Sequence, residues 1–500
     1  MTQLTRAVVH NKKENFPAVK IGSLAAMPEK VLQFGEGNFL RAFVDWQFNE
    51  LINAGLFTGS IVVIQPLASG MVRQLNEQDG LYTVVQRGYR EGKLIERMDV
   101  VTAISRGINP YEQYDEFLDC ARNPDLRFII SNTTEAGIEY VRTERPSSCP
   151  HSYPAKVAVL LYERYKKFKG DPAKGLIIIP CELIEANGDH LKQYVLQHAA
   201  DWHCEPEFTA WIEQSNYFYN TLVDRIVPGY PKDEADALNA AFGYVDKNIV
   251  ACEVFHKWVI QGNEIAQKEL PFTKIGLNVV WTDDITPHRT LKVRILNGAH
   301  TTFTIPSILS GNEFVKESMD DAVVGAFIQK AVFDEILPTL RFSETEKEKF
   351  ARAVLERFKN PFIKHALLSI TLNSVSKYKV RVLPSLLEYV TINASVPRHL
   401  AMGLAALIRF YKPESKNEKG YQGMYNGKSY PISDSADVVE MFDAAWKKAG
   451  TNHAVVAKEI LSNIHFWETD LAAVAGLLDD VVRYLSSIEK IGMKETLRTL

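Results

Sequence analysis

The sequence predicts two domains: an α/β domain built on a doubly wound parallel sheet, followed by a mostly α-helical domain. Short β-branched runs alternate with helix-like segments in the first half, whereas helical periodicity dominates from about residue 290. A chain of 500 residues is also too long for one ordinary core. We therefore expect residues 1–285 to form the first domain, with insertions, and residues 286–500 to form the second.

The first predicted strand leads into a glycine turn. Residues 30–34 are an apolar run with strand character, and Gly35-Glu36-Gly37 follows directly, before a helix expected over residues 39–54. In this order, backbone N–H groups meet a pyrophosphate at the helix N-terminus. The third glycine of the usual pattern is replaced by Leu40. The pattern indicates a Rossmann-type dinucleotide site, and it equally fits a plain Gly-rich turn.

Further strands are expected along the first half, at residues 60–66, 82–86, 127–131 and 175–180. A unit that prefers NAD usually ends its second strand with Asp or Glu, which binds the ribose hydroxyls. Here the second strand ends at Gln65, which can hydrogen-bond a hydroxyl but carries no charge to repel a 2′-phosphate. The nearest arginine that would attract such a phosphate is Arg73. We expect NAD, to which the resemblance given below also points.

The second half reads as helices, at residues 320–332, 344–358, 435–448, 451–464 and 472–489. Residues 411–420 are polar and rich in helix breakers, and we expect them to form an exposed loop.

Composition narrows the classes of partner. Lys+Arg 57 against Asp+Glu 61 gives a formal charge of −4, which argues against nucleic acid or an anionic membrane surface. No apolar run approaches the ~20 residues that span a bilayer. The five cysteines are scattered and lack the paired spacing of zinc sites, as in a reducing cytoplasm. We expect a cytoplasmic monomer or small homo-oligomer that acts on a small molecule without a metal.

Residues 290–301 carry the clearest candidate for chemistry. With 3.6 residues per turn, Lys292, Asn297 and His300 lie within an arc of roughly 140° on one helix. A lysine can move a hydroxyl proton, an asparagine amide can donate to the oxygen, and a histidine can hold either group. The same spacing also fits an ordinary amphipathic helix with a solvated lysine.

Several blocks, taken together and in order, resemble the polyol-specific long-chain dehydrogenases, the family of mannitol dehydrogenase. The blocks are residues 35–42, 134–137, 220–228, 252–260 and 292–300. Within that family, residues 34–46 and 179–185 look most like the tagaturonate reductases, also called altronate oxidoreductases.

The resemblance implies an NAD-binding Rossmann-type domain, a helical substrate domain and an active site in the cleft between them. It implies that Lys292 is the general acid–base, that Asn297 donates to the substrate oxygen and that His300 helps to hold the substrate. The cofactor contacts that we expect are Phe34, Gly35, Gly37, Asn38, Phe39, Gln65, Thr134 and Glu135.

The implied reaction interconverts D-tagaturonate and D-altronate by hydride transfer. Alternatives within the family are reduction of fructuronate or the oxidation of mannitol or a polyol phosphate. A dinucleotide-binding redox sensor is the alternative from another class, although such a sensor needs no Lys292, Asn297 and His300 together.

The family pattern is incomplete near residue 182. Mannitol dehydrogenases carry Cys-Asp-Asn where this chain has Cys181-Glu182-Leu183, so a leucine replaces an amide of the oxyanion site. Asn187 is one candidate to replace that donor. If the resemblance is left aside, Cys181-Glu182 also fits the end of a strand with a solvated carboxylate.

A uronate carries a carboxylate, which requires a cation or an array of hydrogen-bond donors. The candidates are Lys257, Lys377, Lys379 and Arg381, each of which also fits a surface charge. We select Lys257, Lys377 and Arg381 as substrate-binding residues, and we expect at least one of the group to face the cleft.

Overall fold

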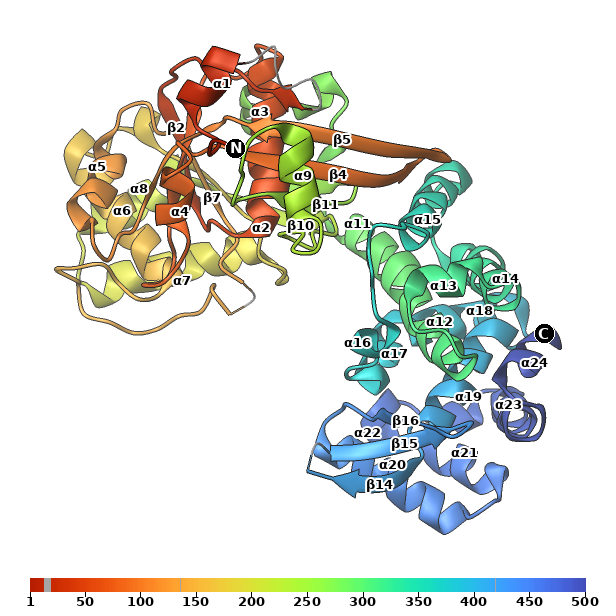
Figure 1. Ribbon diagram of the computed structural model, residues 1–500. Helices are drawn as coiled ribbons and strands as arrows, with labels where there is room; N and C mark the ends of the chain where they lie inside the picture. Colours follow the sequence, from red (N-terminus) through yellow and green to blue (C-terminus); the bar gives the residue numbers. More distant parts are fainter. Residues whose placement is uncertain (13–18, 135, 419) are drawn as a thin grey trace. The chain divides into compact units, whose positions relative to one another are not determined.

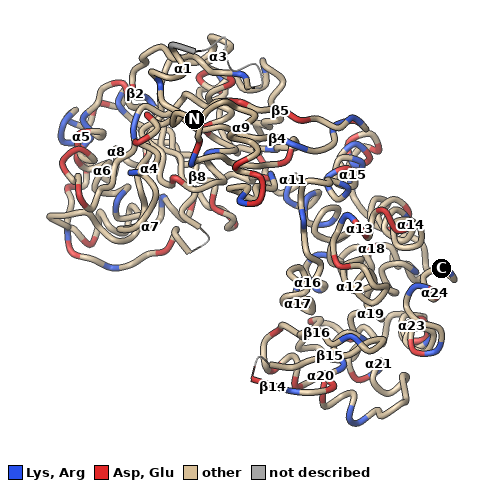
Figure 2. The backbone as a smooth tube through the Cα atoms, in the orientation of Figure 1, with Lys and Arg blue, Asp and Glu red and all other residues tan. Residues whose placement is uncertain are grey.

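The computed structural model describes residues 1–12, 19–134, 136–418 and 420–500. It divides into two compact units: residues 1–88 with 94–288, and residues 89–93 with 289–500 (Figure 1). Lys and Arg are interspersed with Asp and Glu over both units (Figure 2). Within the described residues, we find no helix that is both long and apolar enough to cross a membrane.

A six-stranded sheet forms the centre of the first unit. Its order is β6-β3-β2-β7-β8-β9, and every neighbouring pair is parallel. The strands are β2 (Glu29–Phe34), β3 (Ser60–Ile64), β6 (Ile104–Ile108), β7 (Phe128–Ser131), β8 (Ile177–Pro180) and β9 (Tyr217–Phe218). In chain order within this sheet, that arrangement is the 3-2-1-4-5-6 order of a dinucleotide-binding sheet. Phe34 pairs with both Ile64 and Ser131, so the ends of three strands lie at one edge.

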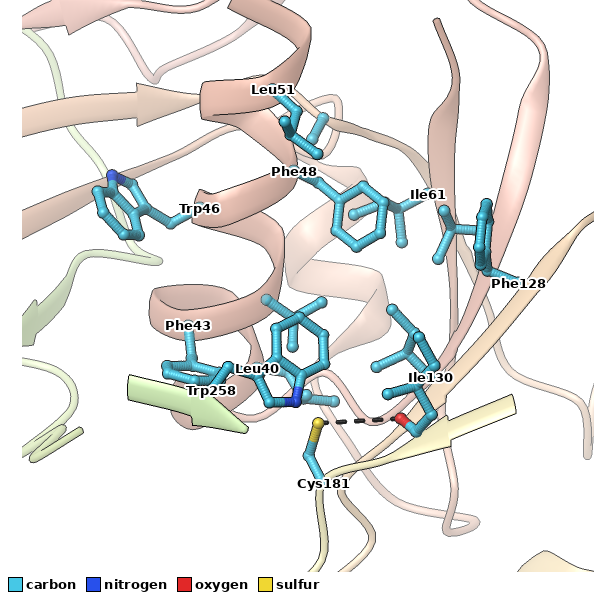
Figure 3. Close-up of a cluster of buried hydrophobic side chains, with 14 of the residues drawn as sticks. Leu40, Phe43, Trp46, Phe48, Leu51, Ile61, Phe128, Ile130, Cys181 and Trp258 are labelled. Atoms are coloured by element: carbon cyan, nitrogen blue, oxygen red, sulfur yellow. Dashed lines mark hydrogen bonds between the residues drawn. The ribbon is translucent and has the colours of Figure 1, made fainter. Parts of the chain in front are cut away.

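Helices cover both faces of this sheet. One face holds the helical segment α2 (Asn38–Leu40), η2 (Arg41–Asp45) and α3 (Trp46–Asn53), which packs on alternate strand residues such as Ile61 and Ile130 (Figure 3). The other face holds α5 (Tyr114–Arg122), α6 (Tyr153–Phe168), α7 (Asn187–Asp201) and α8 (Pro206–Ser215), packed on residues such as Leu32 and Ile129. Side chains alternate between the faces because strand geometry has a period of two.

The strand expected at residues 82–86 exists but belongs to a different sheet. It is β4 (Tyr82–Arg90), in a sheet of order β1-β5-β4-β11 with β1 (Lys20–Ile21), β5 (Lys93–Val101) and β11 (Val250–Cys252). The turn Glu91-Gly92 joins β4 to β5 with positive φ at both residues, as a two-residue hairpin turn requires. A β-branched run predicts a strand, but its partner strand is decided by contacts distant in the chain.

The first unit is completed by a third sheet and short helices. The sheet contains β10 (Asn220–Asp224), β12 (Lys257–Gln261) and β13 (Val279–Thr282). The helices are α1 (Arg6–Lys12), α4 (Val72–Asn76), α9 (Ala235–Phe242) and α10 (Glu264–Glu269).

The second unit is mostly helical, and its centre is α12 (Gly298–Leu309). α12 packs on α19 (Arg398–Phe410), which in turn packs on α23 (Leu477–Ile491). α12 continues from α11 (Thr286–Leu291) and η5 (Lys292–Asn297). The remaining described helical segments are α13 (Val315–Asp320), α14 (Ala322–Lys330), η6 (Ala331–Ile336), η7 (Leu337–Thr339), α15 (Glu344–Phe358), α16 (Leu367–Ile370), α17 (Ser374–Arg381), α18 (Leu383–Asn393), α20 (Ala436–Ala449), α21 (His453–Leu461), α22 (Ile464–Trp467), η8 (Leu471–Ala473) and α24 (Met493–Arg498).

The expected loop at residues 411–420 is wrong in part. Residues 414–418 are exposed, but Pro413–Asn417 form β14, which pairs antiparallel with β15 (Gly420–Tyr425) beside β16 (Lys428–Pro431). Tyr430 of β16 stacks on Phe410 with ring centroids 4.1 Å apart, which anchors the small sheet on α19. Polar residues form this strand because backbone pairing and one anchored neighbour outweigh their low strand propensity.

Candidate active site

The glycine loop after β2 leaves open space above its second glycine. Gly35 has φ +120°, and a Cβ there would lie 3.0 Å from the Asn132 carbonyl oxygen, so glycine is required. Gly37 is exposed and precedes α2 with an extended φ of −67°. Apart from Gly37 and its two chain neighbours, no atom of the described chain lies within 4 Å of a Cβ built on Gly37. This space at the start of the helical segment fits a pyrophosphate group.

Arg41 supports the loop from inside the unit. Its Nε donates to the Glu36 carbonyl oxygen at 3.0 Å, its Nη1 to the Asn248 carbonyl oxygen at 2.6 Å and its Nη2 to Asn38 Oδ1 at 2.7 Å. Arg41 is 2% exposed, and burial lowers its pKa. A buried guanidinium with three different acceptors holds the loop backbone in one conformation.

The expected cofactor residues divide into loop and core positions. Gly35 and Gly37 belong to the loop, Asn38 is the first residue of α2, and Phe39 stacks on Phe43 with ring centroids 5.0 Å apart. The Phe34 ring is instead buried on the opposite face of the sheet. It lies 5.0 Å from the Tyr153 ring and 6.0 Å from the Phe117 ring, so only its backbone faces the loop.

Two further expected cofactor residues, Gln65 and Thr134, follow β3 and β7 in the chain. The side chain of Gln65 is 3% exposed and bonded to its own loop: Nε2 donates to the carbonyl oxygens of Leu67 and Ala68, and Oε1 accepts from Val72 N. Thr134 is exposed, with φ +73°. Glu135 lies outside the described residues.

The interpretation of Glu182 as a solvated carboxylate is wrong. Glu182 is 2% exposed and accepts hydrogen bonds from Ser131 Oγ, Thr133 N and Thr133 Oγ1, while its burial raises its pKa. These hydrogen bonds therefore connect Glu182, just after β8, to the end of β7 in the same sheet.

Asn187 does not serve as a spare amide donor. It is fully buried, and its Nδ2 donates to the carbonyl oxygens of Pro180, Glu182 and Thr221. Its Oδ1 accepts from the backbone N–H groups of Gly188 and Thr221. The Asn187 amide therefore holds the start of α7. Leu183, which stands where mannitol dehydrogenases carry the amide, is 58% exposed.

The helix that carries the catalytic candidates is locally widened in the second unit. Lys292–Asn297 form a π-helical segment, closed by a bond from Gly298 N to the carbonyl oxygen of Val293 five residues earlier. Lys292 and Asn297 are half-buried, and His300 is buried on α12. The α-helical arc expected for the three residues is changed, because residues five apart lie about one turn apart in a π-helix. π-Helical turns of this kind are frequent at functional sites.

His300 lies in a ring-lined, desolvated position. Its ring centroid is 4.2 Å from that of Phe358, 5.4 Å from that of His365 and 5.5 Å from that of Phe303. Its buried Nε2 has no hydrogen-bond partner among the described residues. Burial lowers the pKa of His300 well below its usual value, and the neighbouring ionisable groups of His365, Arg357, Arg381 and Lys377 lower it further.

Those four residues and His300 form a group that we call the His300 cluster. Lys377 and Arg381 lie one turn apart on α17, Arg357 lies near the end of α15, and His365 precedes α16. α15 and α17 both pack on the π-helical segment Lys292–Asn297. Burial lowers the pKa of Lys377, and Arg381 lowers it further. The cluster therefore concentrates cationic groups beside the helix of Lys292, Asn297 and His300.

The other two candidate cations from the sequence, Lys379 and Lys257, lie in different surroundings. Lys379 lies on α17 but forms an ion pair with Glu468 at 2.8 Å. Lys257 lies on β12 of the first unit, opposite Asp224 in the strand register. Arg357 and His365 are absent from the sequence prediction, because no motif or spacing connects them to His300. Only the packing of α15 and the segment before α16 brings them there.

No group of three or more His, Cys, Asp and Glu that could hold a metal ion is found in the described parts of the chain.

Comparison with known families assigns both halves of the chain. Residues 29–274 match the mannitol dehydrogenase Rossmann domain, and residues 284–489 match the mannitol dehydrogenase C-terminal domain. The chain belongs to the mannitol dehydrogenase family. Similar members include the altronate oxidoreductase of Cronobacter sakazakii, 44% identical over 481 residues, which are 95% of this chain and 98% of that one. The altronate oxidoreductase of Shigella flexneri serotype 5b is 43% identical over 483 residues, with the same shares.

These relatives confirm the resemblance seen in the sequence. The protein is an oxidoreductase that acts on CH–OH groups, as the names of these relatives and of the family indicate. The alternative of a non-catalytic dinucleotide-binding sensor is therefore set aside.

Two solved structures share the fold of this chain. A substrate-free D-sorbitol dehydrogenase matches with a TM-score of 0.78 at 22% identity, over 99% of this chain and 100% of that one. The ternary complex of Pseudomonas fluorescens mannitol 2-dehydrogenase with NAD and D-mannitol matches with a TM-score of 0.67 at 21% identity, over 100% and 99%. The predicted fold class, an α/β Rossmann-type domain followed by a mostly helical domain, is confirmed.

Proposed function

We propose that the protein is an NAD-dependent tagaturonate reductase, which interconverts D-tagaturonate and D-altronate. The names of relatives at 43–44% identity support the sugar acid, and the mannitol 2-dehydrogenase solved with NAD supports the cofactor. The observation that carries the proposal is the His300 cluster, because a cationic group beside the catalytic candidates suits a substrate with a carboxylate.

The glycine loop is proposed to bind the pyrophosphate of the cofactor. Exposed backbone at Gly37 and the open space above it support this assignment. When bound there, NADH supplies the hydride for the substrate carbonyl carbon.

Lys292 is proposed to supply the proton. As the carbonyl oxygen gains negative charge, the Lys292 ammonium gives it a proton, and the reverse transfer serves oxidation. The Asn297 amide donates a hydrogen bond to the same oxygen and so stabilises its charge before the proton arrives. His300 is proposed to hold a neighbouring substrate hydroxyl; its lowered pKa keeps the ring neutral, so that one nitrogen can accept a hydrogen bond.

Lys377 and Arg381 are proposed to bind the substrate carboxylate, together with Arg357 and His365. Their common effect on the pKa of His300 supports a shared location. Lys257 stays a further candidate, from the first unit. A guanidinium matches a carboxylate with two parallel hydrogen bonds, whereas a lysine acts as a point charge.

A panel of substrates tests the function. NADH oxidation should be fastest with tagaturonate and slower with fructuronate, fructose and fructose 6-phosphate. Fructuronate as the best substrate would move the protein to the other uronate branch, and fructose as the best would move it to the neutral polyol branch. Fructose 6-phosphate as the best substrate would assign the cationic cluster to a phosphate.

Absence of a metal requirement, a cytoplasmic location and a monomeric or small oligomeric state stay predictions. Dialysis against EDTA should leave tagaturonate reduction unchanged. Loss of activity that returns on addition of zinc would show a metal requirement. The separation of an NAD-binding domain, residues 1–285, from a catalytic domain, residues 286–500, is likewise a proposal.

A further inference from the structure

The acid that usually selects NAD is absent from its usual position in this chain. In dinucleotide-binding sheets, an Asp or Glu at the end of the second strand binds the adenosine ribose hydroxyls. β3 holds that place in the sheet order, and the residue after its last member, Ile64, is Gln65. The amide of Gln65 is already bonded to Leu67, Ala68 and Val72 of its own loop. It therefore offers neither a charge nor a spare donor to the ribose.

A carboxylate from the glycine loop reaches the same place. Glu36 Oε1 accepts a hydrogen bond from Met71 N at 3.3 Å, in the segment that follows β3. A Cβ built on Gly70 would lie 2.2 Å from Glu36 Oε1 and 2.5 Å from Gln65 Cδ. The Glu36 carboxylate thus lies beside the Gln65 amide, at the end of β3, and the absence of a side chain at Gly70 leaves room for it.

The position of Glu36 is set by its backbone. Its carbonyl oxygen accepts from Arg41 Nε at 3.0 Å, and the residue stands between the two glycines of the loop. Glu36 is 9% exposed. Burial raises its pKa, while the hydrogen bond from Met71 and the charge of Arg41 oppose that rise.

We propose that Glu36 selects NAD over NADP, because its carboxylate accepts hydrogen bonds from the adenosine ribose hydroxyls and repels a 2′-phosphate. The inference rests on the proposed function, since it requires a dinucleotide on the glycine loop. Glu36 would then replace the strand-end acid from a neighbouring loop. The first cation after β3 in the sequence is the exposed Arg73, in α4, and removal of the Glu36 charge would leave it unopposed by that carboxylate for a 2′-phosphate.

Nucleotide binding to the full-length protein tests this without turnover. Dissociation constants for NADH and NADPH are measured by nucleotide fluorescence for the wild type, Glu36→Gln and the control Glu77→Gln. Glu77 is an exposed acid just after α4, so its variant removes one nearby charge without touching the loop. We expect the ratio of the NADPH to the NADH dissociation constant to fall at least tenfold in Glu36→Gln and to stay within twofold of wild type in Glu77→Gln.

A purely structural role for Glu36 predicts a different result. If the variant only loosens the loop, NADH and NADPH lose affinity equally and the ratio of their dissociation constants stays unchanged. That outcome overturns the proposal. Competition on the wild type gives a second test, which needs no variant to fold: AMP should displace NADH at a concentration at least tenfold lower than adenosine 2′,5′-bisphosphate. Equal displacement also overturns the proposal. A wild type that binds neither NADH nor NADPH overturns the proposed function itself, and the selectivity of Glu36 with it.

Discussion

Gly298 and Arg381 meet backbone to backbone: a Cβ built on Gly298 would lie 3.0 Å from the Arg381 carbonyl oxygen. This close approach holds α17, with Lys377 and Arg381, beside the helix that carries Lys292 and His300. The glycine thereby sets the spacing between the proposed acid–base helix and the proposed carboxylate-binding helix.

Gly298→Ala should therefore impair catalysis more than folding. The added methyl group displaces α17 by a few tenths of an ångström, and misplacement of ~1 Å in an active site costs up to ~10²-fold. We expect kcat/KM for tagaturonate to fall by about tenfold, with a small change in Tm. Val380→Ala, at an exposed position of α17, is the control. Unchanged kinetics in Gly298→Ala would show that the spacing of α17 does not matter to the reaction.

Lys292→Ala should abolish turnover and leave NADH binding nearly intact. Proton transfer by a positioned side chain contributes ~10²–10⁴-fold, and the proposed nucleotide contacts lie on other residues. Steady-state kinetics and NADH titration measure the two effects separately. Lys330→Ala, which removes an exposed lysine of α14, should leave both unchanged. A kcat near that of the wild type in Lys292→Ala would remove the acid–base assignment.

Gly37→Val should weaken NADH binding far more than it lowers stability. The residue has an ordinary φ of −67° and open space at its Cβ, so the folded chain accepts a side chain there. The same side chain would fill the space proposed for the pyrophosphate. Gly37→Ala should give a smaller loss of affinity in the same calorimetric titration. A folded Gly37→Val protein with unchanged NADH affinity would dispose of the proposed cofactor site.

The enzyme should prefer tagaturonate to tagatose by more than tenfold in kcat/KM. A charge-assisted hydrogen bond contributes roughly 1.5–3 kcal/mol, and about 1.4 kcal/mol corresponds to tenfold. Single replacement of Lys377, Arg381 or Lys257 by Met should identify the responsible cation, mostly through a rise in KM. Lys379→Met is the control, because Lys379 is paired with Glu468. Equal kcat/KM for the two sugars would return the protein to the neutral-polyol branch.

Asp45→Asn should reduce the pH dependence of stability. Asp45 is fully buried, and burial raises its pKa to about 7, although Gln33 and Tyr82 donate hydrogen bonds to it. In the unfolded chain an aspartate has a pKa of about 3.9. Between these values the unfolded state releases the proton and the folded state keeps it. The contribution of Asp45 to the free energy of unfolding therefore falls as pH rises from about 4 to about 7.

The comparison with Asp45→Asn isolates this effect. Relative to the variant, the free energy of unfolding of the wild type should fall by up to about 1.4 kcal/mol per pH unit across that window. Urea unfolding of both proteins at pH 5, 6 and 7 measures the difference. A constant difference across the three pH values would show that Asp45 does not titrate there.

The sequence alone determined the elements whose signal is local. β2, the glycine turn and the helical segment after it follow from an apolar run, two glycines and helical periodicity within some twenty-five residues. The helix predicted from apolar periodicity at residues 344–358 has the observed bounds of α15, and in the structure the Ser343 side chain caps it by accepting a hydrogen bond from Glu346 N. The presence of Lys292, Asn297 and His300 on one helix also follows from the sequence, as does the family.

The tertiary structure decided what depends on partners distant in the chain. β4 joined a second sheet and residues 413–417 became a strand, because strand pairing is made between separate segments. The π-helical turn at Lys292–Asn297 has no signature in a 3.6-residue period. Gln65 lost its expected free amide to its own loop, and Arg357 and His365 reached His300 through helix packing. Local patterns encode which element forms, but the positions of charged side chains are decided by how those elements pack, since burial and nearby charges act through space.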